Sequence, residues 1–395
     1  MPQRSIPDPS RHRAGRFVTQ QSGPAAYTAF IPAPLPPEPP VRFAPPVQGA
    51  LERASHAIGR LDGVTLLLPD PALFIHMYVR KEAVLSSQIE GTQSSLSDLL
   101  LYESDAAPGV PRSDVEEVAN YNRAMQHGLE RLRGGFPLSL CLVREIHALL
   151  VSGTRGGEKA PGEFRTSQNW IGGSRPGDAV FVPPPPHEVM PALADLERFL
   201  NATDDGTPLL VRAGLAHAQF ETIHPFLDGN GRVGRLLVTF LLCAGGALSQ
   251  PLLYLSLYLK GNRARYYELL QRVRTHGAWE EWLVFFLDGV AEVGEQATET
   301  ARRVMALFEE DRRRVVEIGQ SAASALRVYD LLRHHPVLTA TEAARQAALS
   351  FPTASTALRN LERLGIAREV TGRPRDRVYL YQRYVDLLAE GTEPL

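Results

Sequence analysis

The chain has 395 residues, of which 44% are hydrophobic, and a formal net charge of −2 at pH 7. This length is enough for two or three domains with substantial cores. Because the net charge is close to zero, composition gives no global signal for binding nucleic acid or a membrane surface. The two cysteines, Cys141 and Cys243, lie in apolar helical contexts, which argues against a disulfide scaffold and suits a reducing compartment.

The N-terminal segment is polar at its start and then rich in proline. Residues 1–15 lack the apolar core of a signal peptide, and no stretch of the chain is long and apolar enough to span a bilayer. We therefore expect a cytoplasmic protein without membrane contact. Prolines crowd the first fifty residues and predict an extended arm over residues 1–50: Pro32, Pro34, Pro36, Pro37, Pro39 and Pro40.

Helical periodicity dominates the chain that follows the arm. Apolar residues at helical spacing predict buried helices over 73–85, 115–132, 140–150 and around 279–286. The sequence therefore predicts a mainly α fold. Its parts are a helical region at 51–112, a core at 113–290 and a helical linker at 291–320.

The pattern changes after residue 320. Residues 321–388 predict three helices and then two strands, Ile366–Val370 and Val378–Tyr381, around a basic turn, which resembles a winged helix-turn-helix. Arg359 and Arg363 on the third helix, together with the basic turn, suit contacts with DNA phosphates. Acidic residues offset much of this basic charge, so a protein-docking or dimerisation module is the alternative interpretation.

Residues 224–235 carry the densest chemical pattern of the chain, and an apolar run at 236–242 follows them. Gly229 and Gly231 can adopt a positive φ and let a ligand approach the backbone, where successive N–H groups bind anions. The helix expected to begin near Gly231 adds its positive dipole end. This order predicts an anion-binding loop that leads into the N-terminus of a buried helix.

Five side chains give this loop its expected chemistry. Arg232 and Arg235 are three residues apart, so they share a helix face, and their planar guanidinium groups suit phosphate oxygens. Asp228 is a hard oxygen ligand suited to a Mg²⁺ that arrives with phosphates. Asn230 offers an amide donor, and His224 can take a proton from an alcohol near neutral pH. The pattern predicts attack of a hydroxyl on a nucleotide phosphate, with His224 as the base.

The stretch resembles the signature of Fic-domain proteins, His-Pro-Phe-x-Asp/Glu-Gly-Asn-Gly-Arg-x-x-Arg, and every specified position is present at 224–235. The resemblance implies a helical Fic core and transfer of AMP from ATP to a Ser, Thr or Tyr hydroxyl of a protein, with His224 as base and Mg²⁺ held by Asp228. It also implies that the ATP phosphates are bound by Gly229, Asn230, Gly231, Arg232 and Arg235. The complete end of the motif favours AMP transfer over the phosphorylation of the Doc-like branch.

A second element lies upstream, where residues 86–91 read Ser-Ser-Gln-Ile-Glu-Gly. Ser86 and Glu90 are four apart, so we expect them on one face of a helix that Gly91 ends. The element resembles the inhibitory motif of Fic proteins, Ser/Thr-x-x-x-Glu-Gly/Asn, in the class that carries it N-terminal to the catalytic loop. The resemblance implies that Glu90 pairs with Arg235 and blocks the seat of the ATP γ-phosphate.

Between the two elements, short β-prone pieces flank a Gly/Pro turn at 172–177 and predict a β-hairpin. In Fic proteins the corresponding hairpin, the flap, aligns the target segment beside the base by strand addition. The resemblance assigns this role to Ile171, Gly172 and Gly173. A simple surface hairpin is the alternative.

These observations leave three functional hypotheses. The leading one is a protein adenylyltransferase that acts on a protein target, its own chain included, and is restrained by Glu90. The second is a DNA-binding regulator whose Fic core senses nucleotide. The third keeps the fold but removes AMP or transfers another phosphate-containing group, because the loop recognises phosphates and not the base. Fic proteins of this layout often pair through the helical core, so the resemblance also implies a homodimer.

Overall fold

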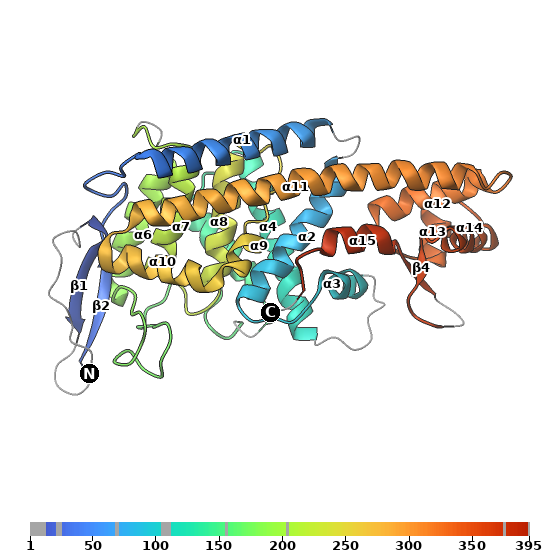
Figure 1. Ribbon diagram of the computed structural model, residues 1–395. Coiled ribbons are helices and arrows are strands. Elements are labelled where there is room, and N and C mark those ends of the chain that lie inside the picture. The colour runs from blue at the N-terminus through green and yellow to red at the C-terminus, as the bar shows by residue number, and fades with distance from the viewer. Residues whose placement is uncertain are drawn as a thin grey trace. The chain divides into compact units, whose positions relative to one another are not determined.

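The computed structural model of the chain describes residues 13–20, 26–67, 71–103, 112–154, 157–202, 205–373 and 377–393. These residues are mainly helical, as predicted (Figure 1). They group by contacts into two compact units: a first unit of Met1–Gly63 and Asn120–Glu295, and a second unit of Val64–Ala119 and Gln296–Leu395. No helix in the described ranges is long and apolar enough to cross a membrane.

The first unit is built from helices. Six belong to it entirely: α5 (Leu140–Leu150), α6 (Pro186–Asn201), α7 (Leu209–Ile223), α8 (Asn230–Ala244), α9 (Ser256–Gly261) and α10 (Arg263–His276). Three belong to it in part: α1 (Pro45–Leu67), α4 (Arg112–Arg133) and α11 (Trp279–Val316). α11 runs without a break through residue 290, so most of the predicted linker is the second part of one long helix.

α7 and α8 form the centre of the first unit, and α6 and α10 pack against α7 (Figure 1). Every residue of α7 from Leu210 to Ile223 is buried, which is the pattern of a helix enclosed on all sides. A Cβ on Gly214 would come within 2.9 Å of the Phe286 ring, and Trp282 Nε1 donates to the Gly214 carbonyl at 2.8 Å. The missing side chain at Gly214 thus lets α11 pack closely on α7.

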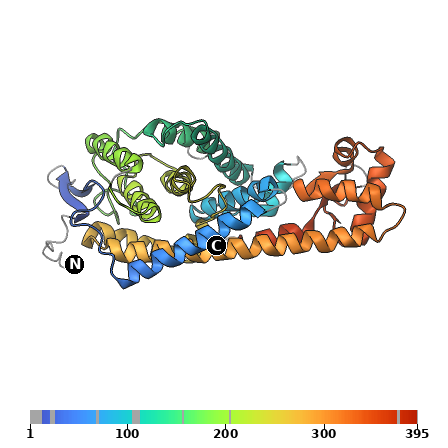
Figure 2. The ribbon, with the colours of Figure 1, turned by 90° about the horizontal axis from the view of Figure 1, so that it is seen from above.

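α1 lies beside the first part of α11 in both views (Figures 1 and 2). The two helices approach closely at Gly294, where a Cβ would stand 3.1 Å from the Cβ of Ala57. Arg53 Nη2 and Asp288 Oδ1 form an ion pair between the same helices at 2.6 Å. Within the first unit, α11 therefore contacts both α7 and α1.

The predicted N-terminal arm contains a β-hairpin that composition does not reveal. β1 (Gly15–Gln20) pairs antiparallel with β2 (Tyr27–Pro32). The proline run after β2 is packed, because the Arg13 guanidinium donates to Pro39 O, Pro40 O and the Glu280 carboxylate at the start of α11. Residues 1–12 and 21–25 of the predicted arm lie outside the described residues.

The predicted flap is a hairpin with a single β-bridge. The N–H of Ile171 donates to Phe181 O at 2.9 Å, and the N–H of Phe181 donates back at 3.2 Å. Gly172 and Gly173 follow with φ of +70° and +75°, a backbone conformation that favours glycine. The N–H of Phe30 in β2 donates to the carbonyl of Val182 at 2.9 Å. One backbone hydrogen bond thus joins the N-terminal hairpin to the end of the flap.

The second unit ends in the predicted winged helix. Its complete helices are α2 (Pro71–Ile89), α3 (Leu96–Glu103), α12 (Ala322–His334), α13 (Ala340–Gln346), α14 (Phe351–Arg363) and α15 (Gln382–Ala389). Three short strands form an antiparallel sheet in the order β3-β5-β4: β3 (Val337–Thr339), β4 (Arg368–Glu369) and β5 (Val378–Leu380). This order of helices and strands is compatible with the predicted winged helix, and β3 adds a third strand to the two that the sequence predicts.

Local signals set the boundaries of the winged-helix elements. Thr339 and Glu342 form a reciprocal capping box at the start of α13, and the Ser350 hydroxyl caps α14 by accepting from the N–H of Thr353 at 3.3 Å. Gly365, with φ +68°, follows the end of α14. Residues 374–376 of the predicted basic turn lie outside the described residues.

Candidate active site

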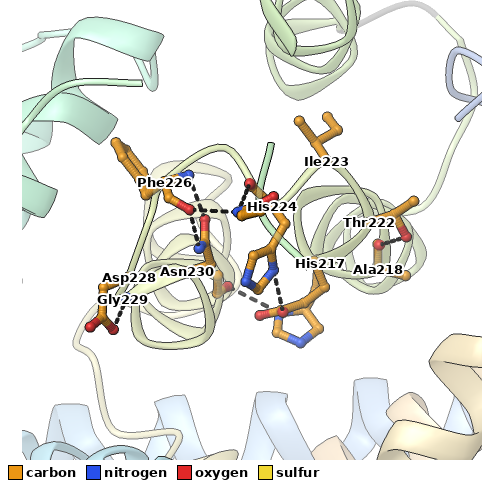
Figure 3. A network of polar contacts seen from close by, with 12 residues as sticks. His217, Ala218, Thr222, Ile223, His224, Phe226, Asp228, Gly229 and Asn230 are labelled. Atoms are coloured by element: carbon orange, nitrogen blue, oxygen red, sulfur yellow. Dashed lines mark hydrogen bonds and ion pairs between the residues drawn. The ribbon is translucent and has the colours of Figure 1, made fainter. Parts of the chain in front are cut away.

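His224 stands at the junction between α7 and the loop that leads to α8 (Figure 3). It caps the C-terminus of α7, and its N–H donates to Phe220 O at 2.9 Å. Its backbone is left-handed, with φ 48° and ψ 61°. Such a conformation costs a residue with a Cβ roughly 1–3 kcal/mol, so surrounding contacts have to stabilise it.

Two side chains from the segment before the flap hold the His224 carbonyl. Arg165 Nε donates to it at 2.9 Å, and Asn169 Nδ2 donates to it at 3.2 Å. The rest of the Arg165 guanidinium donates to three further carbonyls, those of Ser167, Pro184 and Ile223. Burial lowers the pKa of Arg165 to about 10, so the group stays charged. Neither Arg165 nor Asn169 is among the residues that the sequence predicts for the site.

The Asn230 side chain closes the loop on itself. Its Oδ1 accepts from the N–H of Phe226 and its Nδ2 donates to Phe226 O, both at 2.8 Å (Figure 3). Asn230 is only 2% exposed. Because the amide group is engaged inside the loop, a contact of Asn230 with phosphate would come from its backbone N–H or would require the side chain to turn.

Gly229 and the first N–H groups of α8 occupy the predicted anion site. Gly229 is the N-cap of α8, with φ 74° and ψ 6°, and it supplies no side-chain cap. A Cβ at this position would also stand 3.3 Å from Val151 Cγ1, so backbone and packing both favour glycine. The N–H groups of Asn230 and Gly231 are among the donors that a helix start leaves without an acceptor inside the helix.

Arg232 and Arg235 lie in the first two turns of α8, and they are 4% and 3% exposed. Arg232 Nη2 is 3.7 Å from Asp228 Oδ1. Two buried guanidinium groups beside a helix N-terminus make the local potential positive. The structure therefore brings the predicted phosphate residues together at one helix start.

Asp228 is contacted by a cation that the sequence does not predict. Lys159 Nζ lies 3.0 Å from its Oδ2, and the N–H of Gly229 donates to its Oδ1 at 2.7 Å. Burial alone would raise the pKa of Asp228, but the contact with Lys159, the charge of Arg232 and the Gly229 N–H outweigh it and lower the pKa. The carboxylate is therefore ionised at neutral pH.

His147 on α5 braces the same loop. Its ring stacks on Phe226, with centroids 3.7 Å apart and an interplanar angle of 5°. Its Nδ1 accepts from the N–H of Gly162 at 2.9 Å, which leaves the proton on Nε2, 3.1 Å from the carbonyl of Asp228. Burial lowers the pKa of His147 to about 4, so the ring is neutral near pH 7.

Two further polar residues are buried in α7 near the base. Glu221 Oε2 lies 3.9 Å from His224 Nδ1, so a carboxylate faces the ring that would become positive on taking a proton. His217 Nε2 lies 2.8 Å from the Tyr266 hydroxyl, and His217 Nδ1 lies 3.1 Å from the Gly234 carbonyl. Since a carbonyl can only accept, Nδ1 of His217 carries the proton, and burial lowers the pKa of His217 to about 4.

The predicted inhibitory residues lie at the end of α2 in the second unit. α2 ends at Ile89, so Glu90 is the first residue after the helix, and Gly91 follows with φ +105°. The N–H of Glu90 donates to Ser87 O at 3.0 Å, a tighter turn than an α-helix makes. Ser86 is fully buried. Ser86 therefore lies in the last turn of α2, and Glu90 follows the helix and is exposed.

The last turns of α2 contact the C-terminal segment of the chain. Gln88 Nε2 donates to Thr392 O at 2.8 Å and to Ser94 O at 2.9 Å. Lys81 Nζ donates to Glu390 O at 2.8 Å, and burial lowers the pKa of Lys81 to about 8. These bonds tie the end of the predicted inhibitory helix to residues that follow the winged helix.

Two family profiles match this chain. Residues 48–130 match the profile described as Fic/DOC family N-terminal, and residues 137–242 match the profile described as Fic/DOC family. Residues 48–242 thus carry a Fic N-terminal region and a Fic domain. This Fic domain contains all the predicted catalytic, phosphate-binding and metal residues at 224–235, and the inhibitory element at 86–91 lies inside the N-terminal match.

The chain is similar to curated proteins with a named activity. Over 221 residues it is 29% identical to the protein adenylyltransferase Fic of Drosophila melanogaster, a match that covers 55% of this chain and 41% of the fly protein. Over 189 residues it is 30% identical to a probable protein adenylyltransferase of Aquifex aeolicus, covering 48% of this chain and 54% of that protein. The chain thus spans about half or less of the length of these relatives.

Two solved structures share the fold. A Fic family protein from Desulfovibrio desulfuricans G20 aligns with a TM-score of 0.57 and 20% identity, over 87% of this chain and 97% of that one. A Fic domain containing signaling protein from Bacteroides thetaiotaomicron aligns with a TM-score of 0.51 and 18% identity, over 63% of this chain and 95% of that one. At these identities the likeness extends to the fold alone.

Proposed function

We propose that this Fic-domain chain is a protein adenylyltransferase, which transfers AMP from ATP to a Ser, Thr or Tyr hydroxyl of a protein, its own chain included. The observation that carries the proposal is the α7–α8 junction. There a histidine at the end of one helix faces a glycine-capped start of the next, which holds two buried arginines. Relatives that are named protein adenylyltransferases support the same class of reaction.

In the proposed reaction His224 is the general base. The target hydroxyl oxygen bonds to the α-phosphorus of ATP, its proton passes to His224, the bond from the α-phosphorus to the bridging oxygen breaks, and pyrophosphate leaves. Glu221, 3.9 Å from His224 Nδ1, stabilises the imidazolium that forms. A positioned base of this kind typically contributes about 10²–10⁴ to the rate.

The start of α8 binds the phosphates in this proposal. Its leading N–H groups, at Asn230 and Gly231, donate to the α- and β-phosphates, and the adjacent Gly229 lets the nucleotide approach the backbone. Arg232 and Arg235 hold the β- and γ-phosphates with their planar forks. Because these groups are buried and already positioned, they act in a site of low dielectric, where their attraction to phosphate is strong.

Asp228 would hold the Mg²⁺ that accompanies ATP. Its carboxylate is ionised and partly open to solvent, with 31% of the side chain exposed, and one carboxylate with phosphate oxygens is a usual ligand set for Mg²⁺. When bound, the ion supplies positive charge that offsets the phosphate oxygens. Lys159 has to leave Asp228 for this, and its side chain is 51% exposed, so it has room to turn into solvent.

The proposal includes restraint of the wild-type chain by Glu90, which competes with the γ-phosphate for Arg235. One guanidinium cannot hold a carboxylate and a phosphate in the same position. A phosphate therefore replaces the carboxylate only when the end of α2 shifts or the Glu90 side chain turns away. The wild-type chain should accordingly show little activity.

Glu90→Gly tests this proposal with α-labelled ATP and Mg²⁺. Self-labelling should rise at least about ten-fold over wild type, the effect of losing roughly 1.4 kcal/mol of restraint. Glu317 gives a matched control, since it is also the first residue after a helix, and Glu317→Gly should label like wild type. Equal labelling of Glu90→Gly and wild type would contradict the proposal that Glu90 restrains the activity. Absence of label from every variant would reject adenylyl transfer.

A second function, DNA binding by the winged helix, is favoured by one surface of the second unit. Exposed polar side chains follow α14 and continue into the wing: Thr353, Thr356, Arg359, Arg363, Arg368 and Arg373. Fluorescence anisotropy with a labelled DNA duplex tests it. Affinity should fall steeply between about 50 and 200 mM salt, and Arg359→Ala with Arg373→Ala should weaken binding at least about ten-fold. Unchanged binding by this double variant would contradict DNA binding through this surface.

The homodimer and the cytoplasmic location stay predictions.

A further inference from the structure

Two polar side chains connect the base to both ends of the flap. Arg165, which is 4% exposed, lies before the flap and donates to His224 O, and it also donates to Pro184 O, which lies after the flap. Asn169 begins the flap and donates to His224 O at 3.2 Å and to Phe226 O at 2.9 Å. One guanidinium and one amide therefore join the base, the start of the flap and its end.

These contacts explain how His224 keeps a left-handed backbone. A strained residue persists when its surroundings fix it, and here two donors converge on its carbonyl while the N–H of Arg165 donates to Pro225 O at 2.9 Å. Within the described residues, the hydrogen bonds of the Arg165 side chain all go to backbone carbonyls. Arg165 thus fixes the positions of backbone carbonyls, whereas an arginine paired with a carboxylate would contact a side chain that can move.

We propose that Arg165 and Asn169 are positioning residues, which set the place of the His224 base relative to the flap that presents the target hydroxyl. The inference rests on the proposed adenylyl transfer and deepens it. ATP binding should not depend on the two side chains, because the phosphate residues begin at Gly229 and the Phe226 carbonyl keeps its bond from Asn230. The geometry therefore assigns them to the proton-transfer step.

Asn169→Asp tests the inference in the Glu90→Gly background. The change keeps the shape of the side chain, removes both donors and places a carboxylate against two carbonyls. The matched control is Asn201→Asp, because Asn201 Nδ2 also donates to two carbonyls, those of Leu138 and Glu197, at 3.0 and 2.9 Å. We expect kcat for self-labelling to fall by about 10- to 100-fold, the size of effect that follows a misplacement of roughly 1 Å. The Kd for ATP, measured by calorimetry, should stay within about two-fold of the control.

Arg165→Lys gives a second variant that keeps the charge and loses the planar fork. It should lower kcat in the same direction while ATP affinity is kept. A kcat for Asn169→Asp equal to that of Asn201→Asp would overturn the inference. A parallel loss of ATP affinity in Asn169→Asp would also overturn it, because the side chain would then act through the phosphate site.

Amide hydrogen exchange separates this inference from the proposed reaction. The peptide that spans residues 220–228 should exchange faster in Asn169→Asp than in Asn201→Asp, because the loop loses its hold on two carbonyls. Equal exchange overturns the inference whatever the activity. If the Glu90→Gly parent transfers no label, the proposed function fails, and the exchange comparison still decides whether Asn169 holds the base.

Discussion

The catalytic loop (residues 224–235) and the inhibitory segment (residues 86–94) are held in opposite ways. In the loop the backbone is strained at His224, yet the carbonyls of His224 and Phe226 each accept from two side chains. In the inhibitory segment the helix ends in a tight turn, and three buried hydroxyls have no hydrogen-bond partner within the described part of the chain: Ser87 Oγ, Thr92 Oγ1 and Ser94 Oγ.

This difference is expected if the catalytic loop stays in place while the inhibitory segment moves. A buried hydroxyl without a partner costs about 1–3 kcal/mol, so the inhibitory segment gives up stability at these three positions. Segments that move in regulation come from the less stable parts of a protein. The loop has the opposite character, because its bonds fix the base in one orientation. We infer that the regulation proposed for this protein acts on the segment and leaves the loop in place.

The largest expected effect comes from removing the base of the fixed region. His224→Ala in the Glu90→Gly background should lower self-labelling by about 10²–10⁴, the usual contribution of a general base. ATP binding should be kept, because the phosphate residues are untouched. Label incorporation and calorimetry measure the two quantities, and His127→Ala on α4 is the control. A His224→Ala protein that labels within a factor of ten of its parent would contradict the assignment.

Acid should lower the free energy of unfolding through His217, a buried residue of α7. The folded chain keeps this ring neutral, with a pKa of about 4, whereas an exposed ring titrates near 6.5. Between these values the unfolded chain binds more protons, so the free energy of unfolding falls as pH falls from about 6.5 to about 4, by roughly 1.4 kcal/mol per pH unit for this group. Denaturant unfolding at several pH values measures it. His217→Gln should show a shallower acid limb, and an unchanged slope would contradict the prediction.

The inhibitory segment should loosen when its link to the C-terminal residues is removed. Gln88→Leu loses the bonds to Ser94 O and Thr392 O. Because two hydrogen bonds contribute only about 1–3 kcal/mol together, self-labelling should rise by several-fold, less than in Glu90→Gly. Gln48→Leu on α1, whose amide bonds to exposed Glu52, is the matched control. Labelling of Gln88→Leu at the level of the control would show that the C-terminal residues do not steady the segment.

The smallest expected effect concerns Lys159. Lys159→Met frees Asp228 of its ion pair, so half-maximal activity of the Glu90→Gly protein should need about two- to five-fold less Mg²⁺, the range of a partly exposed ion pair. Lys159→Arg keeps a cation and should need as much Mg²⁺ as the parent. An unchanged requirement in Lys159→Met would mean that this contact does not compete with the metal.

The sequence predicts the elements that depend on local signals, such as apolar residues at helical spacing or glycines in a turn. The apolar stripes at 115–132 and 140–150 predict α4 and α5 closely, and the glycines at 172 and 173 predict the turn of the flap. The β1–β2 hairpin escapes prediction, because the prolines around it dominate the composition of the first fifty residues. β3 escapes because three residues are too short for an alternating pattern to emerge.

For the site, the signature at 224–235 predicts which residues gather at the α7–α8 junction. It does not predict what holds them. Arg165, Asn169 and Lys159 reach the loop from 55 to 69 residues away in the chain, so no local spacing connects them to it. His147 is visible in the sequence only as a member of an apolar stripe, although its neutral ring stacks on Phe226. Such partners follow from the packing of helices and are found only with the fold.

Intact-mass measurement of Glu90→Gly protein, after incubation with Mg²⁺ and each nucleoside triphosphate in turn, tests adenylyl transfer by the loop at 224–235. We predict an added mass of one AMP with ATP, and no addition when His224→Ala is combined with Glu90→Gly. No adduct with any nucleotide, or an adduct that persists without His224, would contradict it.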